Sequence, residues 1–324
     1  MKWIDGISPI TFPGLGIEMN PPQGIQFGEF SIRFYAIAIF IGLMLAVLYA
    51  CRWCKRYGLQ EDDLIDGVLY VVPFAVLCAR LYYCAFEWDR FQDNPISILY
   101  IWEGGLAIYG GVIGAAIGIV VLTWFKRRKM KLTTVLDITS IGFLIGQSMG
   151  RWGNFFNREA YGAATDSFFR MGLMLDENRR PSSVEMFWHP TFLYESAWNL
   201  LGFVLLHFLS KKRKFDGQIA LCYVAWYGLG RTFIEGLRTD SLYWGNVRVS
   251  QMLAAITCFA AVVVLVIMMF KKHDPEKLFV NVVAARQTQE VFVGENLTED
   301  VRIDEDLCAP EDIVNVEPEQ KEEL

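Results

Sequence analysis

The chain contains 324 residues, of which 53% are hydrophobic and 20% are charged. This balance is too apolar for an ordinary soluble domain, and the chain is too long for a single helical hairpin. The net charge of −6 is unevenly placed, because residues 271–324 hold 15 acidic and 6 basic residues whereas residues 1–270 carry an excess of bases. The acidity therefore belongs to a C-terminal tail and does not indicate a nucleic-acid partner. With three histidines in the whole chain, a histidine-rich metal site is excluded.

Seven apolar segments follow residues 1–28, a proline-containing stretch that lacks the long apolar run of a cleavable signal peptide. Each segment has close to the roughly 20 residues that a helix needs to cross the hydrocarbon core of a membrane. The predicted spans are residues 34–51, 67–86, 104–125, 132–150, 190–210, 217–236 and 249–270. The sequence therefore predicts an all-α, polytopic membrane protein with about seven transmembrane helices in a domain of residues 1–270.

Basic residues orient these spans, because short loops rich in lysine and arginine stay in the cytoplasm. Such loops follow the first, third, fifth and seventh spans, so we expect the N-terminus outside and the C-terminus in the cytoplasm. The acidic residues 271–324 are poor in aromatics and are expected to form a disordered cytoplasmic tail. The long outer segment at about residues 155–189 is expected to form a lid or a platform at the level of the lipid headgroups. The basic positions are 52, 55, 56, 126–129, 131, 211–214, 271 and 272.

Polar side chains from six helix ends are expected to converge at the outer level of the membrane. An arginine at the centre of a span costs about 2.5–3.5 kcal/mol on insertion scales, so such residues usually have a function. The converging residues are Tyr35, Arg80, Tyr109, Arg151, Asn154, Glu159, His189, Tyr194, Glu195, Arg231, Glu235 and Arg238. Asp137 is the exception, because it lies at the inner end of its span, where we expect a solvated helix cap.

Glycines recur every fourth residue in the third and fourth spans, a spacing that lets helix backbones approach closely. The positions are Gly110, Gly114 and Gly118, and Gly142, Gly146 and Gly150. Because the two helices run antiparallel, we expect Gly110 to meet Gly150, which would bring Tyr109 close to Arg151. The alternative is that the glycines serve helix packing alone, and the two roles are compatible.

Arg231, Glu235 and Arg238 share one face of the sixth span, because they are spaced four and three residues apart. One interpretation is a buried ion pair that holds this helix in the bundle. The other is that Glu235 orients Arg231 for an anion, since paired guanidinium groups match the oxygens of a phosphate. With Arg80 and Arg151 at the same level, a net positive pocket facing the outer leaflet predicts an anionic lipid headgroup.

Residues 150–159 read G-R-W-G-N-F-F-N-R-E and closely resemble the G-R-x-G-N-F-x-N-x-E signature of the prolipoprotein diacylglyceryl transferases. Three further segments resemble the family's motifs in the same order. They are W-E-G-G at 102–105 with Y-G-G at 109–111, H-P-T-F-L-Y-E at 189–195, and R-T-F-I-E-G-L-R at 231–238. The resemblance covers residues 28–270 and leaves the acidic tail outside it.

The resemblance implies a transferase of the bacterial plasma or inner membrane whose active site faces the outer leaflet. Its lipid donor would be phosphatidylglycerol and its acceptor the lipobox cysteine of a prolipoprotein signal peptide, with a thioether as product and glycerol phosphate released. Neither a cofactor nor a metal is implied. Many members carry histidine where this chain has Tyr109, and a phenol is a weaker base than imidazole at neutral pH.

These expectations assign roles to the converging residues. Arg151 and Arg231 would bind the leaving phosphate, with Glu235 orienting Arg231 and Tyr109 donating a hydrogen bond or relaying the thiol proton. Arg151, Asn154, Glu159, Gly162, Arg238, Tyr35, Arg80, His189, Tyr194 and Glu195 would form the substrate-binding set. A transporter would instead spread polar residues through the whole membrane depth. A seven-span receptor would not need several arginines in the outer halves of different helices, and a purely structural protein would not need six polar helix ends.

Overall fold

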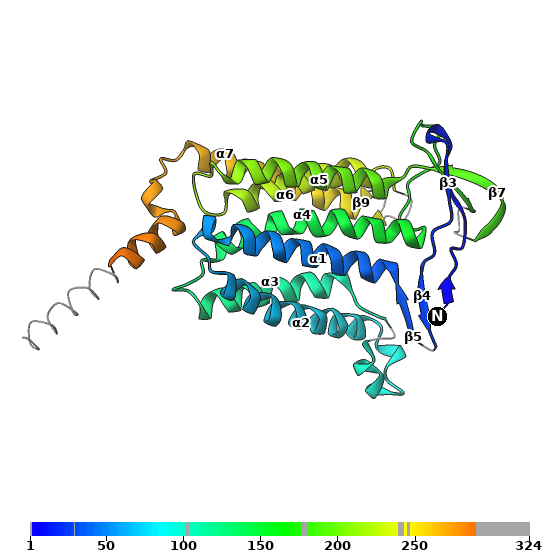
Figure 1. Ribbon diagram of the computed structural model, residues 1–324, viewed down its shortest axis with the longest axis horizontal. Helices are drawn as coiled ribbons and strands as arrows, with labels where there is room; N and C mark the ends of the chain where they lie inside the picture. The colour runs from blue at the N-terminus through cyan, green and yellow to red at the C-terminus, as the bar shows by residue number, and fades with distance from the viewer. Residues whose placement is uncertain are drawn as a thin grey trace, which may run out of the picture.

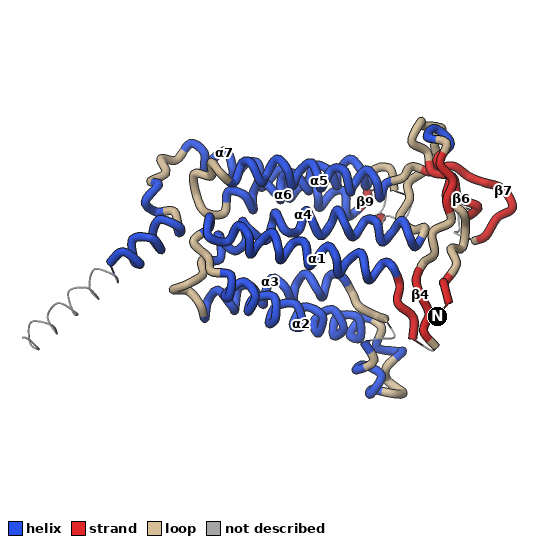
Figure 2. The backbone as a smooth tube through the Cα atoms, in the orientation of Figure 1, coloured by secondary structure: helices blue, strands red, loops and turns tan. Residues whose placement is uncertain are grey.

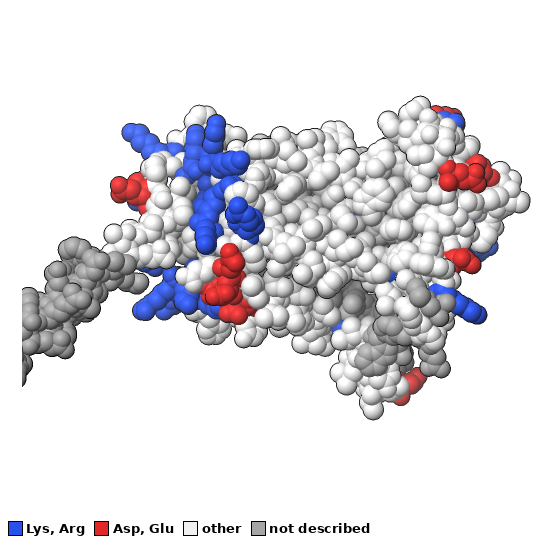
Figure 3. Space-filling view, viewed as in Figure 1, with Lys and Arg blue, Asp and Glu red and all other residues white. Residues whose placement is uncertain are grey.

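The computed structural model describes residues 2–28, 30–101, 104–176, 180–238, 243–244 and 247–289. In this part of the chain, seven long α-helices form a bundle with short strands at one end (Figures 1 and 2). We call that end the sheet end and the opposite end, where lysine and arginine side chains gather, the basic end (Figure 3).

The helices are α1 (Phe34–Trp53), α2 (Glu61–Phe86), α3 (Ile108–Phe125), α4 (Leu132–Asn157), α5 (Thr191–Ser210), α6 (Gln218–Glu235) and α7 (Val249–Phe270). The strands are β1 (Lys2–Ile4), β2 (Ile10–Phe12), β3 (Ile17–Met19), β4 (Gly24–Phe27), β5 (Phe30–Arg33), β6 (Met171–Leu175), β7 (Pro181–Trp188), β8 (Tyr243–Trp244) and β9 (Val247–Arg248). Short 3-10 helices are η1 (Pro13–Leu15), η2 (Cys54–Tyr57), η3 (Trp88–Arg90), η4 (Pro95–Leu99) and η6 (Pro275–Lys277).

Among the described residues, six helices are long and apolar enough to cross a membrane, namely α1 to α5 and α7. Apolar segments of this length form helices in lipid because every backbone N–H and C=O must find its partner within the segment. A mostly helical, multi-pass membrane protein is therefore confirmed. The remaining long helix, α6, carries Arg231 and Glu235 near its C-terminal end, and its place as a seventh span remains a prediction.

Glycines allow close helix approach, but the helices that meet differ from those expected. α3 packs on α2, where a Cβ added to Gly110 would lie 2.5 Å from the backbone oxygen of Cys78. α4 packs on α1, where a Cβ added to Gly42 would lie 3.2 Å from Cα of Gly146. The predicted contact between Gly110 and Gly150 is wrong, since a Cβ on Gly150 would meet no described atom within 4 Å. A four-residue spacing predicts a close-packing face without identifying the helix that covers it.

Asp137 in α4 is fully buried, so its predicted position as a solvated cap is wrong. Its carboxylate accepts hydrogen bonds from the backbone N–H of Gly217, at 2.8 Å, and of Ala220, at 2.9 Å. These amides lie at the start of α6, where backbone N–H groups have no partner within the helix and the helix dipole favours negative charge. Asp137 therefore caps a neighbouring helix and not its own.

The all-α prediction is incomplete at the sheet end. Strands from the N-terminal residues and from the outer segment 155–189 combine in an antiparallel sheet with the order β3-β2-β6-β7, and β1, β4 and β5 form a second sheet. Ile10, Leu173 and Trp188 on the four-stranded sheet are buried together with Phe155 near the end of α4. Because these strands are short and their partners lie far apart in the chain, local patterning does not predict them.

Residues 271–289, which composition placed in a disordered tail, pack against the basic end of the bundle. Phe279 is 6% exposed and lies in a hydrophobic core with Tyr57. The backbone N–H of Phe279 donates a hydrogen bond of 3.0 Å to the buried carboxylate of Asp216, between α5 and α6. Residues 290–324 lie outside the described residues, so the prediction of disorder stays untested there.

We expect deletion of residues 271–324 to lower the thermal unfolding temperature of the detergent-purified protein, whereas deletion of residues 290–324 leaves it unchanged. The longer deletion removes Phe279 from its core, and loss of a buried phenylalanine side chain costs about 3 kcal/mol or more. Phe279→Ala in the full chain should reproduce much of the decrease. Equal unfolding temperatures for the two deletions would contradict a stabilising role for residues 271–289.

Candidate functional site

The buried carboxylate of Glu195 in α5 is the centre of a polar group at the sheet end. Its Oε2 lies 2.5 Å from Nη2 of Arg151 in α4. Its Oε1 lies 3.0 Å from Nη1 of Arg231 in α6 and 3.4 Å from Nη1 of Arg238, shortly after α6. We call these three arginines with Glu195 and Glu235 the arginine cluster. The structure thus brings together predicted site residues from three successive helices, although the residues lie more than 30 positions apart in the sequence.

Within the arginine cluster the carboxylates are interior and the guanidinium groups are nearer the surface. The side chains of Glu195 and Glu235 are 5% and 2% exposed, whereas those of Arg151 and Arg231 are 21% and 19% exposed. Arg231 also contacts Glu235, whose Oε2 lies 2.6 Å from its Nη2. Among the described residues, three arginines therefore face two carboxylates, and the arginine side chains are the more accessible members.

A network of amide and carboxylate groups extends the cluster along the end of α4. Arg151 donates through Nη1 to Oδ1 of Asn154, at 3.3 Å. Oε1 of Glu159 accepts from Nδ2 of Asn154, at 2.9 Å, and from Nδ2 of Asn157, at 3.2 Å. Asn154 can join Arg151 to Glu159 because residues three apart on a helix are neighbours on its surface.

Gly162 joins two segments of the site through its backbone, and they lie too close to leave room for a side chain. Its N–H donates to the backbone oxygen of His189, at 2.8 Å, and it forms an isolated β-bridge with Arg238. A Cβ at this position would lie 2.8 Å from the backbone oxygen of Leu237 and from Cβ of His189. Gly162 therefore ties the segment after α6 to the residue that precedes α5, which brings Arg238 to Glu195.

Tyr35, His189 and Tyr194 lie around this group. Tyr35 packs on α4, where a Cβ added to Gly153 would lie 2.6 Å from its Cδ2. Nδ1 of His189 is 3.4 Å from the hydroxyl of Tyr194. Burial lowers the pKa of His189, so its imidazole is neutral at physiological pH and adds no further positive charge.

Arg80 does not belong to the arginine cluster. Its buried guanidinium donates five hydrogen bonds to backbone oxygens within residues 97–105. A guanidinium has five N–H donors, so this set uses all of them. In the structure Arg80 therefore holds the loop between α2 and α3, and its predicted contribution to a lipid-binding pocket stays untested.

Tyr109 occupies the first turn of α3 and is 60% exposed. α3 packs mainly on α2 and only slightly on α4, and its glycines face α2, so the glycine contact that was expected to bring Tyr109 beside Arg151 is not formed. Its hydroxyl is nevertheless accessible to a bound molecule. Trp102 and Glu103, from the same motif, lie outside the described residues.

Sequence reasoning missed four residues that contribute contacts to this region. Arg158, buried to 2% exposure, follows the last residue of α4, at a motif position where any residue is accepted. Arg248, at the start of α7, donates to the backbone oxygen of Glu235. Ser148 in α4 and Ser196 in α5 join these helices through hydroxyls 2.9 Å apart. No residue spacing predicts these contacts, because each joins segments distant in the sequence.

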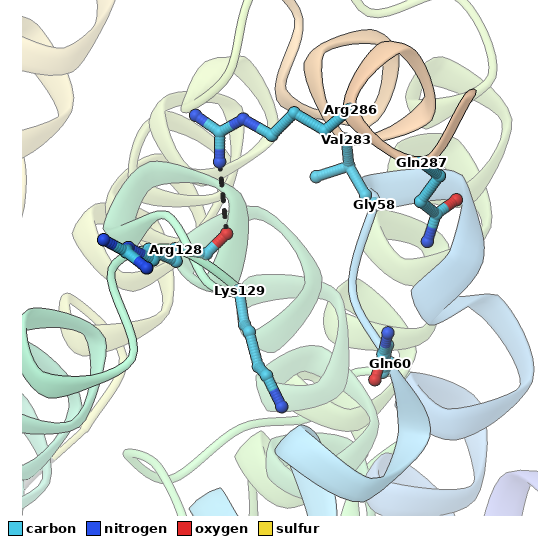
Figure 4. A pocket seen from close by; sticks show the side chains of 7 residues that line it. All are labelled: Gly58, Gln60, Arg128, Lys129, Val283, Arg286 and Gln287. Carbon is cyan, nitrogen blue, oxygen red and sulfur yellow. Dashed lines mark hydrogen bonds between the residues drawn. The ribbon is translucent and has the colours of Figure 1, made fainter. Parts of the chain in front are cut away.

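A cavity of about 530 Å³ lies at the basic end and is lined by none of the predicted site residues (Figure 4). Arg286 from the docked segment crosses to the α3–α4 loop, where it donates a hydrogen bond to the backbone oxygen of Arg128. In the described part of the chain, no three histidine, cysteine or acidic side chains come together in a way that could hold a metal ion. The described residues of the predicted site therefore do not line this cavity.

The chain is similar to known proteins over most of its length. Residues 22–267 match the family model described as prolipoprotein diacylglyceryl transferase. A phosphatidylglycerol--prolipoprotein diacylglyceryl transferase of Enterococcus faecalis is 44% identical over 257 residues, 77% of this chain and 90% of the relative. The same enzyme of Streptococcus sanguinis is 44% identical over 78% of this chain and 98% of its own length. That of Listeria welshimeri is 37% identical over 81% of this chain and 95% of its own length.

Proposed function

Because this chain belongs to the prolipoprotein diacylglyceryl transferase family, we propose that it transfers the diacylglyceryl group of phosphatidylglycerol to prolipoproteins. The acceptor is the thiol of the lipobox cysteine, the products are a thioether and glycerol phosphate, and the reaction is the first step of lipoprotein maturation. The relatives match this chain over nearly their whole lengths, which supports the complete activity.

We place the protein in the bacterial plasma membrane with α6 as its seventh span and the sheet end outside. Lysine and arginine side chains gather at the opposite end, and such residues favour the cytoplasmic side (Figure 3). The buried carboxylate–guanidinium contacts of Arg231 support α6 as a span, because they satisfy charges that would otherwise be costly in lipid. The arginine cluster then faces the outer leaflet.

The observation that carries the site assignment is the arrangement of charge in the arginine cluster. Its carboxylates are buried and its guanidinium groups are partly exposed, so the cluster can accept an anion without losing its internal ion pairs. A phosphate diester fits this surface, because guanidinium groups bind phosphate oxygens with two parallel hydrogen bonds. Arg151 and Arg231 would bind the phosphate, and Arg238 and Asn154 its neighbouring oxygens.

The chemical step follows from this placement. The cysteine thiolate attacks the glyceryl carbon that bears the phosphate, a C–S bond forms, and the C–O bond to the phosphate breaks with its electron pair going to oxygen. Negative charge grows on the departing glycerol phosphate, where fixed guanidinium groups stabilise it most effectively. The same positive charge lowers the pKa of an approaching thiol, so a weak base is sufficient to remove its proton.

Tyr109→Phe tests whether the phenol assists this proton transfer. We expect kcat to fall by about 100-fold, the lower end of the range for general acid–base catalysis, with little change in KM for phosphatidylglycerol. Tyr82→Phe on the facing helix is the matched control, because it also removes one partly exposed hydroxyl. Unchanged turnover in Tyr109→Phe would reduce Tyr109 to a packing residue.

The transfer itself is tested by incubating the purified full chain with phosphatidylglycerol and a synthetic lipobox peptide. Mass spectrometry should find the diacylglyceryl mass added to the cysteine, together with free glycerol phosphate. A peptide with serine in place of cysteine and a lipid with an ethanolamine headgroup are the negative controls. Absence of the adduct from the cysteine peptide would exclude the proposed activity.

A further inference from the structure

The guanidinium of Arg158 closes the base of the β2–β3 hairpin. It donates to the backbone oxygens of Ser8, at 3.0 Å through Nε, and of Pro21, at 2.6 Å through Nη2. It also donates to Oδ1 of Asn20, at 3.0 Å. Ser8 lies just before β2, and Asn20 and Pro21 lie just after β3. Gly6 packs so closely that a Cβ there would lie 2.1 Å from Nη2. Arg158 therefore fastens the N-terminal hairpin to the end of α4 by hydrogen bonds, beside the apolar packing of Ile10 with Phe155.

The backbone at Arg158 is held in an unusual conformation. Its φ is +51°, in the left-handed region that side-chain-bearing residues rarely adopt. Its Nη1 donates back to the oxygen of Phe156, at 2.6 Å, across the same turn. A left-handed residue is a common way to end a helix, and here the backbone N–H groups of Arg158 and Glu159 donate to the last turn of α4.

This turn places Glu159 on the network that reaches the arginine cluster. The N–H of Glu159 donates to the backbone oxygen of Asn154, at 3.1 Å, and its carboxylate accepts from the side-chain amide of Asn154. Asn154 in turn accepts from Arg151. A chain of contacts therefore runs from the hairpin base through Arg158 and Glu159 to Arg151.

Arg158 keeps its charge in this buried position. Burial lowers its pKa to about 10, so the guanidinium is still protonated at neutral pH. In the described residues, its four hydrogen bonds go to three backbone oxygens and one amide oxygen. It differs in this from Arg151, Arg231 and Arg238, which contact carboxylates.

We propose that Arg158 is a positioning residue for the transfer reaction: by fastening the β2–β3 hairpin to the turn after α4, it fixes Glu159 and Asn154 so that Arg151 is held for the lipid phosphate. The inference rests on the proposed function. It assigns to the N-terminal hairpin a role in catalysis, through a residue that does not touch the substrate.

Kinetics of purified variants test this role. Arg158→Gly deletes the guanidinium while glycine tolerates the left-handed backbone, and we expect kcat to fall by about 10- to 100-fold, as for small misplacements of reacting groups. KM for the lipobox peptide should stay within about twofold, since the proposed misplacement concerns the phosphate and not the peptide. Arg170→Ala, at a partly buried arginine on the same sheet end, should leave both parameters unchanged.

Glu159→Ala and the double variant Arg158→Gly/Glu159→Ala distinguish a positioning role of Arg158 from a general effect on stability. If Arg158 acts through Glu159, Arg158→Gly should cause no further loss once Glu159 is alanine. Losses that multiply in the double variant would overturn the inference, as would full activity of Arg158→Gly. If Arg158→Gly does not fold, Asn20→Ala is the substitute variant, because it removes one hydrogen-bond acceptor of Arg158. Asn20→Ala should lower kcat in the otherwise unaltered chain. It should cause no further loss in a chain that already carries Glu159→Ala. Failure of the unaltered protein to transfer the lipid would instead refute the proposed function.

Discussion

Replacement of Arg151 by alanine is expected to lower the rate of diacylglyceryl transfer by about 100- to 1000-fold, the effect of removing one preorganised donor from a charge-stabilising site. Arg151 is the member of the arginine cluster with the largest exposed fraction, 21%, and it contacts both Glu195 and Asn154. Its loss removes a charge from the surface where the leaving phosphate would gain negative charge. The measurement is formation of the diacylglyceryl adduct on a lipobox peptide.

Arg151→Lys refines this test, because lysine keeps the charge but cannot make two parallel hydrogen bonds. We expect partial activity from this variant if charge alone contributes, and activity close to that of Arg151→Ala if geometry dominates. Arg170→Ala controls for the loss of an arginine outside the cluster. Near-normal transfer by purified, folded Arg151→Ala would remove Arg151 from the proposed mechanism.

Glu195→Gln is expected to have the largest combined effect on stability and activity. The side chain keeps its shape but loses the charge that three guanidinium groups share. Removing one partner of a buried ion pair typically costs about 3–5 kcal/mol, because the remaining charge is left uncompensated. We expect a lower thermal unfolding temperature in detergent, together with strongly reduced transfer, since Arg151 and Arg231 would move apart.

Glu185→Gln is the matched control, because Glu185 is exposed on β7 at the same end of the molecule. It should leave both the unfolding temperature and the transfer rate unchanged. A Glu195→Gln variant as stable and active as the unaltered chain would show that the arginines do not depend on this carboxylate. A Glu195→Gln variant that is stable but inactive would show that Glu195 places the arginines without contributing to stability.

Several expectations failed where tertiary contacts decide the outcome. The glycines of α3 do form a close contact, but with α2 and not with α4. Arg80 was expected to join the polar residues at the outer level, yet its donors all serve a loop. Glu195 was one of ten residues in the expected substrate-binding set, and the structure makes it the centre of the site. In each case the residue type was informative, whereas its partner depended on which helices lie side by side.

The family and the membrane-spanning segments could be predicted because they depend on local sequence. Apolar runs of sufficient length form helices wherever they enter lipid, and the ten-residue motif around Arg151 identifies the family, in agreement with the match over residues 22–267. The sequence by itself thus determined the mostly helical, membrane-spanning character, the family and the residues of the arginine cluster, but not the strands at the sheet end. Seven spans and the orientation of the bundle remain predictions from the same local signals.

Only the tertiary structure decided how these residues are combined. It placed Glu195 between arginines from α4 and the α6 region, built a sheet from strands more than 100 residues apart, and docked residues 271–289 on the basic end. It also placed Arg158 at the base of an N-terminal hairpin that precedes it by more than 130 residues. These contacts join distant segments whose pairing depends on the packing of the whole bundle, and no local pattern of residues encodes that packing.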